Sequence, residues 1–490
     1  MIQNKFDTVV QQLKSRVLCE VARDYWDGTL EEKRHSIPKM ISPGPKSTMR
    51  CCIYKERAIV EDRVYLALGG DKKNPNLLEV IEAACDQCPF GGITVTDLCR
   101  GCLAHRCEQA CRVGAISFGK DLRCIIDKTK CVNCGMCMKA CQFNAIANIR
   151  RPCELACKIN AIHPREDGIT WIDEEKCVRC GQCSYACPFG AIMDKSFITK
   201  CIDIIKGSEN NTKYKTYMIV APSISSQFHY AKVGQVVTGI RRLGFAEVVE
   251  AALGADLVAY NEAGNLAEEG SCTSSCCPAF VEYVRKAFPA LSDKVSKNLS
   301  PMAAIARFIK ANDPEAKTVF VGPCIAKKME MFREDSAPFV DCVITFEELE
   351  ALIDSRDINL SELEETKLDT ASYFGRIFAR SGGLSEAVAE ALKERGSDFA
   401  VQPIKASGLD QCKLALNQMK SGRLAGNFIE GMACPGGCIG GPACLTHEVR
   451  DASTVDKYGL ESSASSIREA IDGIKADATI ASNADLIQRQ

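Results

Sequence analysis

The chain has 490 residues, with 61 basic and 63 acidic side chains and a formal net charge of −2 at pH 7. This balance offers no electrostatic reason to expect a nucleic-acid partner, and no apolar run approaches the roughly 20 residues that span a membrane. Thirty cysteines are many for this length. Because the N-terminal stretch lacks the apolar core of a secretion signal, we expect a cytoplasmic protein whose thiols bind metal in a reducing compartment. Iron–sulfur clusters are the first candidate, and zinc is the alternative.

Residues 1–80 form an N-terminal segment whose role the sequence does not reveal. Apolar residues at helical spacing predict an opening helix, and they are Val9, Val10, Leu13 and Val17. Residues 51–54 and 58–68 are expected to form short strands. Three cysteines of the segment have no ligand spacing and are interpreted as ordinary buried thiols: Cys19, Cys51 and Cys52.

Residues 81–205 are organised by a repeat. The pattern C-x3-C-x3-A-I occurs four times, beginning at Cys107, Cys137, Cys153 and Cys183, and successive copies start 30, 16 and 30 residues apart. The copies therefore fall into two pairs, which we assign to modules at 95–147 and 150–200. Each pair has the size of a two-cluster ferredoxin module.

Longer cysteine runs within this region resemble the C-x2-C-x2-C-x3-C run of bacterial ferredoxins. Two runs are complete: Cys131, Cys134, Cys137, Cys141 and Cys177, Cys180, Cys183, Cys187. A looser run consists of Cys99, Cys102, Cys107 and Cys111. The copy at Cys153 and Cys157 lacks its first two cysteines, and Cys85 and Cys88 supply only that missing half. Together these thiols suffice for four [4Fe-4S] cubanes.

The ferredoxin resemblance also implies how these thiols are grouped, since the fourth cysteine of a run binds the cluster of the partner run. The implied groups are Cys99, Cys102, Cys107 with Cys141; Cys131, Cys134, Cys137 with Cys111; Cys177, Cys180, Cys183 with Cys157; and Cys85, Cys88, Cys153 with Cys187. The alternative is that Cys85 and Cys88 are structural, which leaves between two and four accessory clusters.

A polar linker at 206–213 leads into a domain of a different kind. Strands are predicted at 217–222, 248–249, 318–321, 339–345 and 427–429. Helices are predicted at 233–243, 254–268, 278–288, 302–310, 347–353, 384–392 and 412–420. Strands that alternate with helices indicate an α/β domain, at 206–446, with its site at the strand ends. The polar residues 447–490 are expected to be a peripheral tail.

Three cysteine motifs lie in this domain. Residues 430–441 place Cys434 and Cys438 on a glycine-rich turn, which allows close approach of the backbone to a bulky ligand. Residues 274–280 contain Cys276 and Cys277, and residues 321–330 contain Cys324. In this order the motifs resemble the three H-cluster signatures of the [FeFe]-hydrogenase family, over about residues 81–446. The resemblance implies an α/β catalytic H-cluster domain, preceded by α+β two-cluster ferredoxin-like modules and a small N-terminal segment.

The H-cluster of that family joins a cubane to a two-iron subsite that carries carbonyl, cyanide and dithiolate ligands. The resemblance implies these cubane ligands: Cys277, Cys324, Cys434 and Cys438, of which the last also bridges to the two-iron subsite. It places Lys327 at a cyanide, with donors from the turn Ala221, Pro222 and Ser223. Cys276 matches the proton-transfer thiol, and Met432 packs beside the two-iron subsite. The alternatives are an exposed lysine like its neighbour Lys328, an unreactive buried thiol and a methionine of the ordinary core.

The onward proton route departs from the family pattern. Glu262 matches its first carboxylate and Ser296 its serine, but Asn265 stands at the second carboxylate, and an amide does not exchange protons as a carboxylate does. Glu268 and Glu269 are candidates by proximity only. Other departures resemble the group B branch and alter the surroundings of the cluster: Gly322, Met302, Ala279 and Phe280.

The function that the resemblance implies is reversible conversion of protons and electrons to H2, with electrons relayed by the accessory clusters to or from a soluble ferredoxin-type carrier. Maturation proteins would build the two-iron subsite, and neither nucleic acid nor a membrane is expected as a partner. Three alternatives remain: a hydrogen sensor, for which no appended sensory module is visible; an iron–sulfur cluster assembly factor; and a plain electron-transfer protein.

Overall fold

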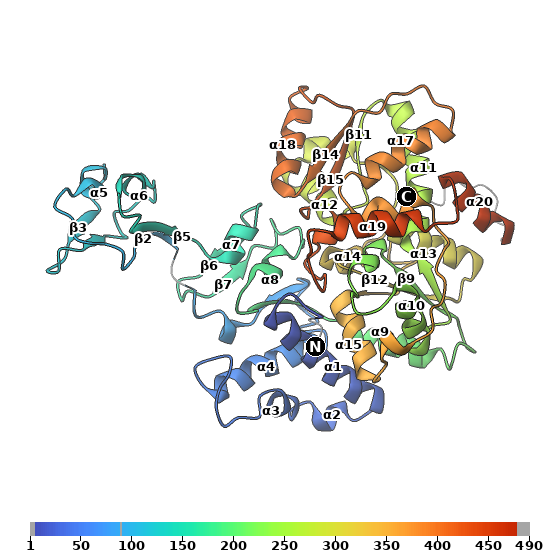
Figure 1. Ribbon diagram of the computed structural model, residues 1–490, viewed down its shortest axis with the longest axis horizontal. Helices are drawn as coiled ribbons and strands as arrows, with labels where there is room; N and C mark the ends of the chain where they lie inside the picture. Colours follow the sequence, from blue (N-terminus) through green and yellow to red (C-terminus); the bar gives the residue numbers. More distant parts are fainter. Residues whose placement is uncertain (1–4, 89–90, 478–490) are drawn as a thin grey trace.

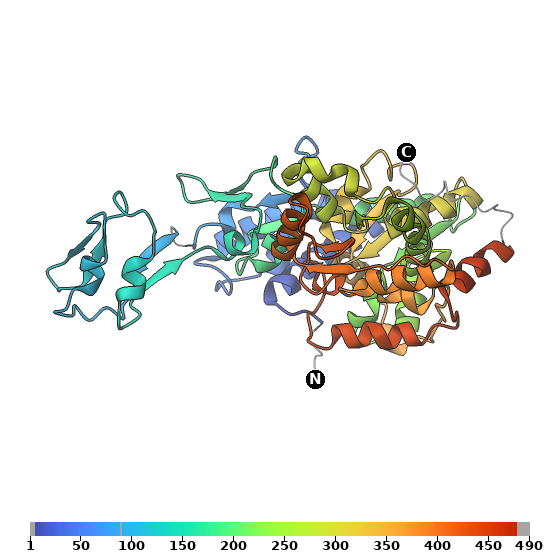
Figure 2. The same cartoon turned by 90° about the horizontal axis from the view of Figure 1, so that it is seen from above.

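The computed structural model describes residues 5–88 and 91–477. The molecule is elongated, with a large α/β domain at one end and a small cysteine-rich module at the other, as Figures 1 and 2 show. A second cysteine-rich module lies between them, and the N-terminal helices pack beneath this second module and the α/β domain (Figure 1). Across the described ranges, the structure contains no helix with the length and hydropathy needed to cross a lipid bilayer.

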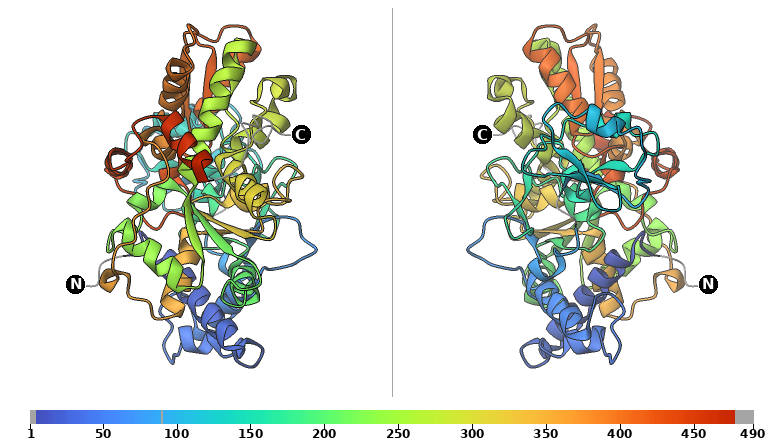
Figure 3. Two further views of the ribbon diagram at one scale, coloured as in Figure 1. Left: turned by 90° about the vertical axis from the view of Figure 1, so that its right-hand side faces the viewer. Right: turned by 90° about the vertical axis from the view of Figure 1, so that its left-hand side faces the viewer.

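The α/β domain is built on two parallel sheets. The larger sheet has the strand order β10 (Glu247–Glu250), β9 (Thr216–Val220), β12 (Lys317–Gly322), β13 (Cys342–Thr345). The smaller sheet has the order β11 (Cys272–Thr273), β15 (Phe428–Met432), β14 (Pro403–Ser407). Figure 3 shows the two sheets with helices on their faces. Strands β13 and β15 are buried along their whole length, as expected for parallel strands covered on both faces.

Helices connect these strands. In chain order they are α10 (Val233–Arg242), α11 (Ala251–Glu269), α12 (Pro278–Ala287), α13 (Pro301–Asn312), α14 (Ile325–Glu330), α15 (Phe346–Ser355), α16 (Tyr373–Arg376), α17 (Gly383–Glu394), α18 (Leu409–Lys420), α19 (Asp451–Leu460) and α20 (Ile467–Asp477). Short 3-10 turns are η2 (Pro222–Ser226), η3 (Pro289–Lys294), η4 (Leu360–Glu362), η5 (Ile377–Ala379) and η6 (Cys438–Gly440). Every helix and strand predicted for this domain is present. β11, β14 and α16 were not predicted, because β11 and α16 have only 2 and 4 residues and β14 lacks a clear periodicity.

The two cysteine-rich modules are nested rather than consecutive. β1 (Leu78–Val80) pairs with β8 (Ile192–Asp194), and β2 (Gly92–Val95) pairs with β5 (Ile146–Ile149). The segment from β2 to β5 is therefore an outer module inserted into an inner module, which consists of residues 78–88 and 151–194. The predicted boundary at residue 81 is thus slightly wrong, because β1 already belongs to the inner module.

Each module has the same small set of elements. The outer module also contains α5 (Arg106–Gln109), β3 (Ile116–Phe118), β4 (Cys124–Ile126) and α6 (Met136–Ala140). The inner module contains η1 (Glu82–Ala84), α7 (Pro152–Ala156), β6 (Ile162–Pro164), β7 (Thr170–Ile172) and α8 (Gln182–Ala186). The strands pair as antiparallel hairpins, β3 with β4 and β6 with β7. These pairs agree with the two repeated modules predicted from the cysteine pattern.

The N-terminal segment is helical. It contains α1 (Val9–Asp27), α2 (Leu30–Lys33), α3 (Ile37–Ile41) and α4 (Ile53–Ala67), and α9 (Ile198–Gly207) packs against α1. The helix predicted from the apolar pattern is confirmed as α1. The strands expected at 51–54 and 58–68 are wrong, because β-branched residues such as Ile59 and Val60 bury one face of α4 instead. Tertiary packing overrides the weak strand propensity here.

A buried ion cluster joins three parts of the chain. Lys14 on α1 lies 2.5 Å from Asp194 of the inner module and 2.6 Å from Glu347 on α15. Lys328 on α14 lies 2.7 Å from the same Asp194 and 2.8 Å from Glu348. The expectation that Lys328 is exposed is wrong, since it is completely buried. We call these five residues the interdomain ion cluster.

The segment after residue 446 is not peripheral. Tyr458 on α19 is buried, and its hydroxyl donates a hydrogen bond of 2.7 Å to Glu250 at the end of β10. Arg376 on α16 donates to the backbone carbonyl of Tyr458 at 3.1 Å. The expectation of a peripheral tail is therefore wrong for residues 447–477, and residues 478–490 lie outside the described part of the chain.

Candidate metal centre

A cavity lies beyond the carboxyl ends of β9, β12 and β15, where the chain leaves each strand. It encloses about 90 Å³ and is lined mainly by apolar side chains. The lining includes the thiol-bearing residues Cys276, Cys277, Cys324, Cys434 and Cys438, together with the charged residue Lys327. We call it the central cavity. Its position at the strand ends agrees with the place expected for the site of an α/β domain.

The four predicted ligand cysteines come from three different connections. Cys277 immediately precedes α12, Cys324 immediately precedes α14, and Cys434 and Cys438 follow β15. Burial raises the pKa of Cys277, while the backbone N–H groups of Ala433, Phe280 and Ala279 oppose this shift. Such N–H groups stabilise negative charge on sulfur, which a metal-bound thiolate requires.

The glycines of residues 430–441 serve close packing of the turn against its neighbours. A Cβ at Gly431 would lie 2.4 Å from the ring of Phe280, and a Cβ at Gly441 would lie 2.5 Å from the carbonyl oxygen of Pro323. Gly437 has φ = 94° and lies against the backbone of residues 379–381. A larger residue at these positions would displace the segment that holds Cys434 and Cys438.

Two residues with polar side chains, Lys327 and Ser223, line the central cavity. Lys327 is buried, and its Nζ donates to Glu330 at 2.6 Å and to the carbonyl oxygen of Cys276 at 3.4 Å. Ser223 is completely buried, and its Oγ has no hydrogen-bond partner among the residues that the structure describes. A cation and an orphaned donor beside four thiols suit a group with anionic ligands. These residues therefore fit an iron–sulfur centre of the H-cluster type.

The remaining lining residues make the wall of the central cavity mainly apolar. Met432 and Met302 are both buried at the cavity wall, as are Phe320 and Phe378. Sequence reasoning named Met432 and Met302 but missed the two phenylalanines, because a lone aromatic residue in an α/β domain gives no signal of a site. Ala221 and Pro222 complete the wall at the end of β9, as the resemblance implied.

Cys276 lines the central cavity, and Glu262 is close enough to affect the pKa of its thiol. Burial raises the pKa of the Cys276 thiol, and the neighbouring groups Cys277 and Glu262 add to that shift. Glu262 is completely buried on α11. Ser296, also predicted for the proton route, is buried, and its Oγ accepts a hydrogen bond of 3.3 Å from the backbone N–H of Asn298.

Beyond Glu262, the predicted proton route reaches side-chain amides instead of a second carboxylate. Asn261 and Asn265 both donate to Oδ1 of buried Asn298, at 2.7 and 3.5 Å. Further along α11, Glu269 forms an ion pair of 3.1 Å with Lys297 at the surface. The structure therefore places an amide cluster where a second relay carboxylate was sought, and the candidate carboxylate Glu269 carries a salt bridge.

The inner module brings its thiols close to the central cavity. Burial raises the pKa of Cys180 to about 12, and the adjacent thiols Cys177, Cys157 and Cys277 add to the shift. Cys277 belongs to the central cavity, so sulfur atoms of the two sites are neighbours. The side chain of Gln182 links the inner module to the α/β domain by donating to the carbonyl oxygen of Gly440 at 3.1 Å.

The structure gathers the inner-module thiols into the two predicted groups. Cys183 is surrounded by Cys180, Cys177 and Cys157, and burial with these neighbours raises its pKa. In the second group, burial raises the pKa of Cys153 to about 11, with further contributions from Cys187 and Cys85. Burial also raises the pKa of Cys88, followed by the effect of Cys187. Cys85 and Cys88 therefore lie beside their predicted companions, although about a hundred residues separate Cys85 from Cys187 in the chain.

The outer module shows one predicted group directly. A small cavity of about 20 Å³ is lined by four cysteines, Cys111, Cys131, Cys134 and Cys137. The other group, Cys99, Cys102, Cys107 and Cys141, has an additional neighbour that sequence reasoning missed. Cys124 on β4 lies 4.0 Å from Cys107, sulfur to sulfur, and its backbone N–H donates to the sulfur of Cys99 at 3.4 Å. Nothing in the spacing of Cys124 identifies it, because it lies outside every repeated run.

Comparisons with known families agree with the division of the chain. Residues 214–442 match the family described as "Iron only hydrogenase large subunit, C-terminal domain". Residues 124–147 and 170–193 match the family described as "4Fe-4S binding domain". These two stretches contain one complete cysteine run each.

Curated relatives include both enzymes and assembly factors. Iron hydrogenase 1 of Clostridium pasteurianum is 28% identical over 387 residues, which cover 68% of this chain and 66% of the relative. The NADP-reducing hydrogenase subunit HndD of Solidesulfovibrio fructosivorans is 31% identical, over 42% of this chain and 45% of that subunit. The cytosolic Fe-S cluster assembly factor NAR1 of Eremothecium gossypii is 33% identical, over 26% of this chain and 31% of that factor. The matches thus span less than two thirds of each of these relatives.

Solved structures show the same fold. The [FeFe]-hydrogenase HydA(deltaEFG) superposes with a TM-score of 0.50 and 20% sequence identity, over 60% of this chain and 98% of that one. At this identity the likeness concerns the fold alone.

Proposed function

We propose that this chain, which belongs to the iron-only hydrogenase family and carries ferredoxin-type 4Fe-4S domains, interconverts protons and hydrogen at an H-cluster in the central cavity. The proposed reaction is 2H⁺ + 2e⁻ ⇌ H2. One observation carries the proposal: four cysteines from three connections, Cys277, Cys324, Cys434 and Cys438, converge with Lys327 on one dry cavity beside the inner module. A plain electron-transfer domain needs the four thiols but not the lysine and the additional thiol Cys276.

Bound in this cavity, an H-cluster would supply the iron at which hydrogen is made or split. The residues of the chain would hold the cluster and stabilise its anionic ligands. The four cysteines would hold the cubane, Lys327 would neutralise an anionic ligand, and the orphaned Oγ of Ser223 would donate a hydrogen bond to another. Burial makes these contacts strong, because no water competes for them.

Protons would be handled by Cys276 and Glu262. The thiol of Cys276 lies at the cavity wall, and Glu262 is the carboxylate that raises its pKa most. A thiol and a carboxylate in sequence can each hold and release a proton. Ser296 would continue the route, and the amide cluster at Asn298 would limit it unless water bridges to Glu269.

Electrons would pass through the cysteine groups of the two modules, two groups in each, which we propose to be four [4Fe-4S] clusters. The inner module adjoins the central cavity, and the outer module projects away from the body of the protein (Figure 1). Cys102 and Cys134 of the outer module are exposed, so electron exchange with a soluble ferredoxin-type carrier would take place there. We propose a cytoplasmic setting because thiol-rich sites need a reducing compartment.

A second candidate is a non-catalytic iron–sulfur role, favoured by the likeness to the NAR1 assembly factor. A hydrogen sensor would use the same ligands as the enzyme. The departures Gly322, Met302, Ala279 and Phe280 support placement in the group B branch, where the surroundings of the cluster differ. In this chain Phe320 lies in the space beside Gly322, 2.9 Å from the position of a Cβ there. A measurement of hydrogen turnover distinguishes an enzyme from a sensor.

The test is infrared spectroscopy of the anaerobically matured full chain in the carbonyl and cyanide stretching region, with a hydrogen assay that uses reduced viologen. Bands with turnover are expected. Bands without turnover would favour the sensor, and an absence of bands after competent maturation would favour the assembly or electron-transfer role. The variant Cys324→Ser is a control that should lose the bands, whereas Cys19→Ser should keep them, because Cys19 lies on α1, outside both modules and the central cavity.

A further inference from the structure

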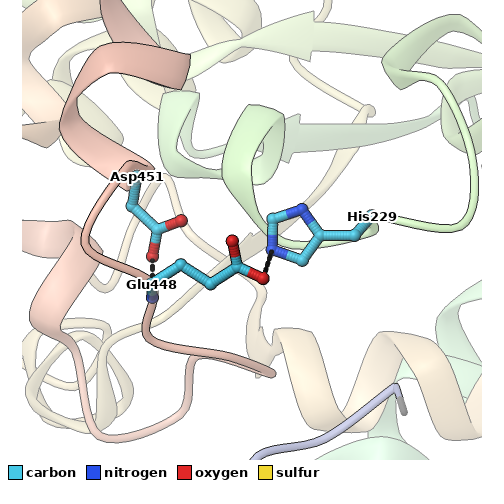
Figure 4. A group of neighbouring side chains, drawn as sticks. All are labelled: His229, Glu448 and Asp451. Atoms are coloured by element: carbon cyan, nitrogen blue, oxygen red, sulfur yellow. Dashed lines mark hydrogen bonds and ion pairs between the residues drawn. The ribbon is translucent and has the colours of Figure 1, made fainter. Parts of the chain in front are cut away.

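A second group of ligand-type side chains lies outside the central cavity and outside both modules. It consists of His229, Glu448 and Asp451, which offer one ligand atom each, and these atoms all lie within 4.8 Å of one another. His229 follows η2, Glu448 precedes α19, and Asp451 is the first residue of that helix. Figure 4 shows the Glu448 side chain extended from the Asp451 side of the group toward the imidazole of His229. We call it the His–Glu–Asp group.

Hydrogen bonds leave one ligand atom of this group without a partner. Oδ2 of Asp451 accepts the backbone N–H of Glu448 at 2.9 Å. Oδ1 of the same carboxylate is buried and has no hydrogen-bond partner within the described ranges, although Asp451 is only 2% exposed. On the other side, Nε2 of His229 lies 3.8 Å from Glu448 and 2.9 Å from Oγ1 of Thr446.

An unpartnered oxygen on a buried carboxylate is costly. Leaving a buried polar group unsatisfied costs about 1–3 kcal/mol, and more when the group is charged. The separation of 3.8 Å between His229 and Glu448 is also longer than a hydrogen bond. A cation placed among the three side chains would give Oδ1 of Asp451 a partner. It would also draw the ligand atoms of His229 and Glu448 closer together. Neither the family resemblance nor the proposed hydrogen chemistry uses these residues.

We propose that the His–Glu–Asp group binds a divalent transition-metal ion of the Zn²⁺ class. The donors are one imidazole nitrogen and two carboxylates, with the hydroxyl of Thr446 or water to complete the coordination. Carboxylates alone would suit Mg²⁺ or Ca²⁺, but an imidazole ligand favours zinc and its neighbours in the first transition series. Iron–sulfur chemistry is a poor match, because it needs thiolates.

The position of the group suggests what such an ion does. His229 lies six residues after Ser223, which forms one wall of the central cavity, and Glu448 lies ten residues after Cys438, which forms another. Gln227 already joins these segments, since its Oε1 accepts the backbone N–H of Leu445 at 2.7 Å. A metal ion would add a further cross-link between these two segments, beside the contacts of Gln227 and His229. Its role is structural, because it would join the two segments that form these walls.

The experiment uses the full chain with its iron–sulfur clusters intact. Anaerobic holoprotein is equilibrated with ZnCl2, passed through a chelating resin and analysed for zinc and iron by mass spectrometry. We expect about one zinc ion per chain, in addition to the iron of the clusters. X-ray absorption at the zinc edge should show nitrogen and oxygen ligands at about 2.0–2.1 Å; sulfur ligands at about 2.3 Å would mean zinc in a cysteine site and would overturn the proposal.

Variants assign the zinc to its site. His229→Ala and Glu448→Gln should each lose at least tenfold in zinc affinity while iron content stays unchanged. The matched control is His35→Ala, because His35 forms an exposed ion pair with Glu61 at 2.9 Å without a third ligand, and its zinc affinity should equal that of the wild type. Should one variant fail to retain iron, the other still tests the site, since the two lie on different segments. Equal zinc binding by wild type and both variants, or no retained zinc in the wild type, overturns the proposal.

Discussion

Replacing Lys14 by methionine should loosen the contact between the N-terminal helices and the rest of the protein. In the interdomain ion cluster, Asp194 lies between Lys14 and Lys328, at 2.5 and 2.7 Å, and its side chain is 1% exposed. Burial alone raises the pKa of Asp194, but the two lysines outweigh it and hold the pKa well below its usual range. Methionine preserves the length of the side chain but removes one of two cations that serve three carboxylates.

The expected cost is about 3–5 kcal/mol at pH 7, the usual effect of removing one partner from a buried ion pair. The cost should shrink as the pH falls toward 4. A carboxylate with a lowered pKa stabilises the folded state above its unfolded pKa near 3.9 and loses that effect on acidification. In the variant, Asp194 or Glu347 can take up a proton instead of remaining charged and unpaired, so acid relieves the variant more than the wild type.

Hydrogen exchange of the α1 amides is the suitable assay, because a multidomain cluster protein has no single free energy of unfolding. Since each 1.4 kcal/mol is a factor of ten, exchange should accelerate between about a hundredfold and several thousandfold. Lys33→Met is the control: Lys33 pairs with Asp24 at 3.2 Å with half of its side chain exposed, and such pairs contribute about 0–1 kcal/mol. Equal exchange rates in the two variants at pH 7 would refute the assigned role of the cluster.

Three further predictions concern single side chains. Cys276→Ala should lower turnover by about 10²–10⁴-fold with unchanged iron content and infrared bands, and turnover at the wild-type level would show that protons enter elsewhere. Burial raises the pKa of Asp256 on α11 to about 8, so this residue contributes stability that is lost as the pH rises from 4 to 8. Asp256→Asn should reduce the pH dependence of hydrogen exchange of the α11 amides, after correction for the intrinsic exchange rate, and an unchanged pH dependence would contradict this. Cys153→Ser should lower the iron content by up to four per chain relative to Cys19→Ser, and equal iron would favour the structural reading of Cys85 and Cys88.

Much of the site could be predicted from local spacing. The repeated cysteine runs carry their ligand chemistry in the sequence, and the crossing rule then brings together residues as distant as Cys85 and Cys187. Most strands and helices of the α/β domain could also be predicted, because each of the longer ones has a clear apolar periodicity. The roles expected for Ser223, Lys327 and Cys276 were implied by the resemblance of the surrounding motifs to the [FeFe]-hydrogenase family.

The features that could not be predicted from the sequence depend on contacts between distant segments. Cys124 belongs to no run, and only the pairing of β3 with β4 places it beside Cys107. Lys328 looks like any surface lysine until Asp194 and Glu348 meet it from two other parts of the chain. Likewise His229 and Asp451 have no common motif. Helix α4 was mistaken for strands because its β-branched residues are compatible with either structure, and packing against α1 decides between them.

The nesting of the modules sets an order of events during synthesis. Cys85 and Cys88 leave the ribosome first, but Cys187 follows about a hundred residues later, which at roughly 5–20 residues per second takes about 5–20 s. During that interval the outer module, whose strands β2 and β5 pair with each other, can close on itself. The inner-module group of Cys85, Cys88, Cys153 and Cys187 cannot be completed until Cys187 has been made, just before β8 pairs with β1. The end of the molecule farthest from the central cavity is therefore able to take up iron before the part that adjoins it.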